Sequence, residues 1–350
     1  MAMRPGGEMT DTKKPIIHEN HDWLEAVVEE IVEPERPIID PHHHLWIARG
    51  AGDYLLPELW GDTNSGHNIE KTVFIECHAE YRKEGPEHLR PIGETEFVTA
   101  IADQSDAGDA GQARVAGIVA AADLRLPTEV LQQVLDGHAN AAKGRFRGIR
   151  QAGAYEANRD ILFIKPRQPA DLYLDEDFRR GVRTLGDQGL TYDTWHYHHQ
   201  NRDFLEFVKS VPETTIVLDH FGTPLGVGPY AGQRDEIYQQ WRKDIADIAQ
   251  CPNVVAKLGG LAMPDNGFGW NLGDVPPTSD EFITAQSRYY MHTLECFGVD
   301  RCMFESNFPV DKWSLSYHVV WNAFKKMVMD CSEDDKHKLF YANAKRVYRL

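Results

Sequence analysis

The chain has 350 residues, with 54 acidic and 37 basic side chains and a formal net charge of −17 at pH 7. This excess of negative charge disfavours a surface that follows the phosphates of nucleic acids or anionic lipids, so we expect neither a nucleic-acid nor a membrane partner. Residues 1–14 lack the apolar core of a signal peptide, and the five cysteines include no Cys-x-x-Cys pair. We therefore expect a cytoplasmic protein with reduced thiols, a disordered tail over residues 1–15 and one domain over residues 16–350.

Short apolar runs alternate with amphipathic stretches along the chain, which is the pattern of parallel βα units. An extra helix is expected first, over residues 22–33. The eight predicted strands cover residues 38–40, 72–77, 115–120, 146–150, 190–193, 215–220, 254–258 and 301–306. The predicted helices between them cover residues 94–106, 128–142, 175–187, 201–210, 233–249 and 279–297. Two segments are expected to be long irregular loops at the mouth of the fold, residues 45–70 and 259–277.

Eight such units predict a single (β/α)8 TIM barrel, whose active site lies at the C-terminal ends of the strands. A doubly wound sheet is the alternative, but no Gly-rich phosphate loop follows any predicted strand. Polar side chains fall at the predicted strand ends: His42, His44, Glu76, His78, Arg150, Trp195, His196, His220, Lys257 and Asn307. The barrel would therefore bring them together at one mouth.

The first of these strand ends carries two histidines, His42 and His44, two residues apart. Because side chains alternate along a strand, both imidazoles should face the same side. Such a pair can hold a divalent cation or polarise a carbonyl group. It can equally be a polar strand end whose imidazoles are satisfied by hydrogen bonds.

Three motifs together resemble the amidohydrolase-related proteins, and in particular their lactonase-like branch. They are Asp40-Pro41-His42-His43-His44, Leu218-Asp219-His220-Phe221-Gly222 and Met303-Phe304-Glu305-Ser306-Asn307-Phe308-Pro309. The resemblance implies a TIM barrel in which the first-strand histidines and the sixth-strand histidine, His220, belong to the active site. It also implies an aspartate at the end of strand eight, within Gly-Ser-Asp-x-Pro, as the general base that activates water.

This chain departs from that pattern at the end of strand eight. It has Asn307 where the aspartate is usual and Glu305 where glycine is usual. Because an amide cannot take a proton from water, the base must lie elsewhere. Either a carboxylate serves, with Asp311 or Glu76 as candidates, or His220 serves as a neutral imidazole. The third alternative is a different reaction, such as decarboxylation, hydration or isomerisation, or binding without turnover.

The resemblance leaves the metal question open, because both metal-dependent and metal-free members are implied. One divalent cation, Zn or Mn, would be held by His42, His44, Glu76 and His220, since oxygen and imidazole ligands suit these metals. A metal-free mechanism is the alternative. Glu76 could instead form an ion pair with Arg150 or Lys257.

We expect the substrate to be a small molecule, a carboxylated lactone or similar cyclic ester that activated water opens. Arg150 would bind its carboxylate with two hydrogen bonds, unless the guanidinium pairs with Glu76. Other substrate contacts are expected from aromatic and histidine side chains: Trp46, Tyr54, Trp195 and His199. The alternatives are a metal-dependent decarboxylase or hydratase and a catalytically silent binding barrel. A homo-oligomer is compatible with the sequence.

Overall fold

The computed structural model of the protein describes residues 21–49 and 52–350. Its main sheet has eight strands, and every neighbouring pair in the order β1-β4-β5-β6-β7-β8-β9-β10 is parallel. The strands are β1 (Pro37–His43), β4 (Asn68–Ile75), β5 (Arg114–Ala120), β6 (Phe146–Arg150), β7 (Thr191–Thr194), β8 (Ile216–Leu218), β9 (Val254–Leu258) and β10 (Cys302–Phe304). The predicted eight-stranded TIM barrel is confirmed.

The barrel closes between its first and last strands just beyond the end of β10. The backbone N–H of His44 donates to the carbonyl of Phe308 over 2.8 Å, and His43 forms a parallel bridge with Phe308. The buried carboxylate of Asp40 accepts hydrogen bonds from the backbone and hydroxyl of Ser306. These contacts bring the first-strand histidines next to the end of strand eight.

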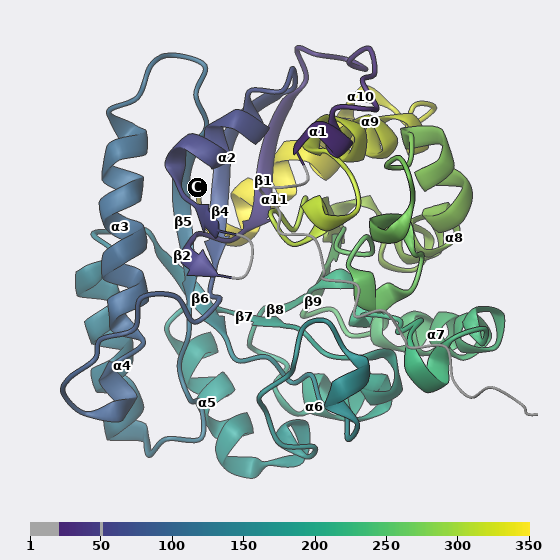
Figure 1. The fold of residues 1–350 in the computed structure, drawn as a ribbon. Coiled ribbons are helices and arrows are strands. Elements are labelled where there is room, and N and C mark those ends of the chain that lie inside the picture. The colour runs from purple at the N-terminus through teal and green to yellow at the C-terminus, as the bar shows by residue number, and fades with distance from the viewer. Residues whose placement is uncertain (1–20, 50–51) are drawn as a thin grey trace, which may run out of the picture.

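Helices surround the strands, as Figure 1 shows. They are α3 (Ile92–Asp106), α4 (Thr128–Ala141), α5 (Glu176–Asp187), α6 (Asn201–Ser210), α7 (Arg234–Ile248), α8 (Ser279–Phe297), α9 (Tyr317–Met327), α10 (Glu333–His337) and α11 (Asn343–Tyr348). Side-chain caps fix two of the predicted starts, since Asp175 and Thr278 accept hydrogen bonds from the first turns of α5 and α8. None of the helices in the described residues is long and apolar enough to cross a bilayer.

Two predictions for the N-terminal part are wrong, and the expected tail over residues 1–15 lies outside the described residues. The extra helix α1 covers only His21–Leu24, because the backbone beyond it bonds to other elements; the N–H of Val32, for example, donates to Asn322. The segment 45–70 is not irregular. It contains an antiparallel pair, β2 (Trp46–Arg49) and β3 (Gly52–Tyr54), and the helix α2 (Leu56–Thr63).

Alternate strand positions fill the barrel interior with apolar side chains. They are Ile39, Val73, Ile75, Val119, Val217, Val255 and Met303. The C-terminal helix α11, yellow in Figure 1, adds Ala344, Val347 and Tyr348 to the same cluster. Two residues further along their strands, the same alternation puts the ionisable side chains of Asp219, Lys257 and Glu305 above this apolar layer.

Candidate active site

A cavity of about 670 Å³ lies at the C-terminal ends of the strands. This volume is typical of small-molecule sites. Seven of the predicted site residues line it: His44, Trp46, Glu76, Arg150, Trp195, His220 and Asn307. The structure therefore gathers most of the predicted site around one cavity.

His42 and His44 reach the site because β1 is irregular at its end. Its pairing with β4 shifts register between Asp40 and His43, so that His42 points inward although it lies three residues beyond the inward-facing Ile39. The His44 ring bonds through Nδ1 to the carbonyl of Ile75 over 2.8 Å, and a carbonyl only accepts. Nδ1 of His44 therefore carries the proton, and Nε2 is left as an acceptor.

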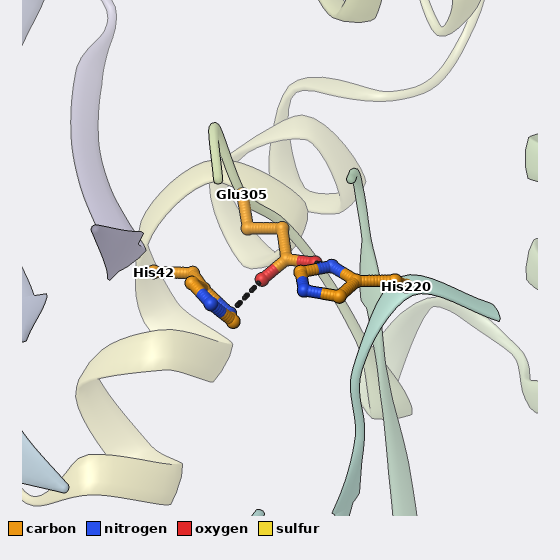
Figure 2. Close-up of side chains that lie close together, drawn as sticks. All are labelled: His42, His220 and Glu305. Carbon is orange, nitrogen blue, oxygen red and sulfur yellow. Dashed lines mark hydrogen bonds and ion pairs between the residues drawn. The ribbon is translucent and has the colours of Figure 1, made fainter. Parts of the chain in front are cut away.

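Glu305 lies between two histidines of the predicted site, as Figure 2 shows. Its Oε2 atom is 2.7 Å from Nδ1 of His42, and its Oε1 atom accepts a hydrogen bond of 2.7 Å from Nδ1 of His220. Burial raises the pKa of Glu305 to about 8 and lowers the pKa of His220 to about 3. The sequence singled out Glu305 only as a departure from a pattern, and the structure places it at the centre.

A fully buried lysine, Lys257, lies beneath this group. Its Nζ atom is 3.0 Å from Asp193 and 3.1 Å from Asp219, and 4.0 Å from Glu305. The hydroxyl of Tyr348, on α11, donates to Asp193. Burial opposes the charge of Lys257, but Asp219 and Asp193 outweigh it and raise the lysine pKa. The C-terminal helix thus contributes to the polar layer that supports the site.

Glu76 and Arg150 form the ion pair that the sequence left open. The Arg150 Nε atom donates to Glu76 Oε1 over 2.8 Å, and the guanidinium also donates to the Glu76 carbonyl. Burial would raise the pKa of Glu76, but His78 and Arg150 lower it. The pair with Arg150 therefore keeps Glu76 ionised.

Asn307 and Asp311 are joined by a hydrogen bond of 2.8 Å from the amide Nδ2 to Asp311 Oδ1. The other oxygen of Asp311 accepts from the backbone N–H of Ala262. Asp311 is buried, does not line the cavity, and burial raises its pKa well above the usual range. It is placed to orient the Asn307 amide.

Two predicted substrate contacts lie away from the cavity. The hydroxyl of Tyr54 donates to Asp62 over 2.6 Å, and the ring is buried. His199 stacks on Tyr230 and contacts the carbonyl of Tyr155. Tyr54 belongs to the β2–β3 pair and His199 to a turn after β7, and both elements direct these side chains away from the cavity.

The segment after β6 lines much of the cavity, and sequence reasoning missed it. It contributes Ala152, Arg159, Phe163, Ile164, Lys165, Pro166, Arg167 and Gln168. Asp265, in the predicted loop 259–277, anchors this segment by accepting from the backbone of Phe163 and Ile164. The concentration of basic residues in positions 159–167 of an otherwise acidic chain was the available signal.

Histidines, carboxylates and a buried lysine thus lie together at the C-terminal mouth of a parallel TIM barrel. The sequence profile of the amidohydrolase family matches residues 39–350. The chain therefore belongs to the amidohydrolase family, as the three motifs predicted.

Similar proteins are found over nearly the whole length. An uncharacterized protein, y4mH, of Sinorhizobium fredii is 33% identical over 329 residues, covering 89% of this chain and 98% of its own. The L-fucono-1,5-lactonase of Burkholderia multivorans is 27% identical over 326 residues, covering 89% of this chain and 96% of its own. A crystal structure of an amidohydrolase from Burkholderia multivorans, with bound zinc, shares the fold with a TM-score of 0.70 at 24% identity, covering 89% and 99%.

Proposed function

We propose that this protein is a hydrolase that opens a lactone, or a similar cyclic ester, of a small carboxylated organic acid. The observation that carries the proposal is the orientation of His44, whose Nδ1 is fixed by the Ile75 carbonyl while the ring lines the cavity. The similarity to an L-fucono-1,5-lactonase supports a lactone as the substrate.

His44 would act as the base in place of the missing aspartate. Burial and the charge of Arg150 lower its pKa well below the usual range, so the ring is neutral at pH 7. Its Nε2 atom would take a proton from water as the water oxygen bonds to the carbonyl carbon. The ring C–O bond then breaks, and the proton passes from His44 to the departing oxygen. The products are the open hydroxy acid and the regenerated imidazole.

Asn307 would stabilise the oxyanion of this reaction. One hydrogen of its amide nitrogen is committed to Asp311, and the second remains for a substrate oxygen. A donor of this kind is worth about 10²–10³-fold in turnover. The amide is thus useful at a position where a carboxylate would repel the developing charge.

Three arginines that line the cavity support an anionic substrate. The guanidinium groups of Arg49, Arg159 and Arg167 have no hydrogen bond or ion pair within residues 21–49 and 52–350. Arg150, the predicted anchor, is already paired with Glu76. In a chain of net charge −17, unpaired cations around one cavity favour a carboxylate ligand.

The buried donor set also fits a divalent cation. The possible ligand atoms of His42, His220 and Glu305 lie within 4.8 Å of one another, and two histidines with a glutamate are a known zinc donor set. These three residues would hold the metal, which when bound would polarise the substrate carbonyl or lower the pKa of water. His44 stands outside this set, so its proposed proton transfer does not depend on the metal.

The test is hydrolysis of a panel of lactones, followed by proton release at constant pH and by product NMR. We expect turnover of carboxylated lactones, a loss of about 10²-fold or more in His44→Gln, and normal turnover in His337→Gln, an exposed control. Normal turnover in His44→Gln would refute the assigned base.

The same donor set favours one other reading, a metal-dependent decarboxylase or hydratase on this scaffold. The assay distinguishes it, because carboxylic acids offered to the protein would then release CO₂ or take up water. Binding of these ligands without turnover would identify a silent binding barrel.

A further inference from the structure

We propose that His78 is a specificity-determining residue of the cavity, whose Nε2 atom accepts a hydrogen bond from a hydroxyl group of the substrate. The inference rests on the proposed function, because it takes the anionic substrate of that site and adds a second recognised group to it. The ligand is then a hydroxylated carboxylic acid or its lactone.

His78 belongs to two adjoining hollows at the mouth of the barrel. Its side chain lines the cavity of about 670 Å³ and also a side pocket of about 150 Å³. Both hollows are lined by Glu76, Arg150, Ala152 and Gln168 as well, so the side pocket lies directly beside the cavity. The side pocket is larger than the ~30 Å³ that one water molecule occupies in the liquid. It has room for a short substituent of a ligand that is bound in the cavity.

The backbone of His78 is held in a conformation that residues other than glycine rarely adopt. Its φ angle is 63°, in the left-handed region. The buried carboxylate of Glu94 accepts hydrogen bonds from the backbone N–H groups on both sides, over 3.0 Å from Cys77 and 2.7 Å from Ala79. Backbone strain that the surrounding structure maintains is concentrated at functional sites. The turn after β4 therefore holds the His78 ring in a fixed place at the cavity.

The contacts of Nδ1 determine which nitrogen of the His78 ring carries the proton. Nδ1 is 2.6 Å from the hydroxyl oxygen of Tyr81 and 3.4 Å from Oε2 of Glu76. This Glu76 oxygen is buried and accepts no hydrogen bond from any residue that the structure describes. Because a buried charged oxygen needs a donor nearby, the proton of the neutral ring belongs on Nδ1, where the Tyr81 oxygen can also accept it. Nε2 is then an acceptor.

The Nε2 atom of His78 is free for a ligand. It makes no hydrogen bond within residues 21–49 and 52–350, and the side chain is 32% exposed. A carboxylate offers only acceptors and cannot bind to an acceptor nitrogen, whereas a hydroxyl group can donate to it. The unpaired arginines would bind the carboxylate of the substrate, so His78 would recognise a different group of the same molecule.

The test is equilibrium binding, which needs no turnover. Isothermal titration calorimetry at pH 8, where an ordinary imidazole is neutral, would compare gluconate with each of its monodeoxy analogues. We expect that removal of one particular hydroxyl weakens binding to the wild type about 10-fold or more, because Nε2 is then left without its donor. In His78→Asn the same removal should change the affinity less than about twofold.

The variant His78→Asn separates recognition from folding. Asparagine tolerates the left-handed region, and its amide nitrogen replaces Nδ1, but no atom reaches the position of Nε2. His78→Gln places an amide oxygen near that position and should restore part of the discrimination. His337→Asn, at an exposed site, is the control and should behave as the wild type. With a hydroxylated lactone as substrate, His78→Asn should raise KM about tenfold and leave kcat unchanged.

Three outcomes would overturn the proposal: no binding of gluconate to the wild type, the same losses for every analogue in the wild type and in His78→Asn, or a lower kcat with KM unchanged, which would make His78 a proton carrier. Failure of the proposed function is recognised separately. If no lactone is hydrolysed while His78→Asn still abolishes the discrimination, the recognition by His78 stands and the hydrolase assignment falls.

Discussion

Replacing Lys257 with methionine should destabilise the protein strongly although the side chains have similar length. Lys257 is fully buried, and its Nζ atom lies 3.0 Å from Asp193 and 3.1 Å from Asp219. Methionine fills the space but leaves both carboxylates without their cation. Removal of one partner from a buried ion pair costs about 3–5 kcal/mol, a large share of the ~5–15 kcal/mol by which domains are stable.

Equilibrium urea unfolding, followed by tryptophan fluorescence and circular dichroism, would measure this loss. The matched control is Lys143→Met, because Lys143 pairs with Asp103 over 2.8 Å at an exposed site, where loss of the pair should change the stability only slightly. Adding Asp193→Asn and Asp219→Asn to Lys257→Met should recover part of the stability, since the two carboxylates closest to Nζ are then neutral amides. A loss in Lys257→Met no larger than in Lys143→Met would refute the reasoning.

Three further outcomes are expected. Burial and the charge of Glu76 raise the pKa of Glu94 from 4.5 to about 8, so between these pH values the folded protein retains a proton that the unfolded chain releases. The free energy of unfolding of the wild type therefore falls as pH rises through this window. Glu94→Gln should be more stable than the wild type at pH 8 in urea melts, and a less stable variant would contradict the shift. Ser306→Ala removes the hydroxyl that bonds to Asp40 where the barrel closes, and a stability loss of about 1–3 kcal/mol is expected; no loss would mean that the closing bond is dispensable. Arg159→Gln should raise KM for a carboxylated lactone about tenfold with kcat unchanged, and an equal effect on uncharged lactones would argue against a carboxylate contact.

The sequence alone predicted the barrel and much of its site. The eight predicted strands match the eight strands of the sheet within a few residues at each end, and the helices α6 and α8 match exactly. The short apolar runs of the strands and the capping residues at helix starts are local signals, and they recur at successive strands and helices of this chain. His44 and His220 lie at the cavity because strand ends share one mouth in any such barrel.

The sequence left the partner of Glu76 open between Arg150 and Lys257 and did not predict the partner of His220, because such pairs are set by contacts between distant strands. Glu76 meets Arg150 across 74 positions, and His220 meets Glu305 across 85. The helix expected over residues 22–33 failed for the same reason, since its backbone bonds to α9 outweigh the local preference for a helix.

What the sequence by itself determined is the order of strands and helices and the residue types at each strand end. What only the tertiary structure decided is which of those residues face each other. It brought Glu305 between two histidines, put Lys257 under them and moved Asp311 out of the cavity. The physical reason is that burial and nearby charges change what an ionisable side chain can do, and both depend on neighbours that are far away along the chain.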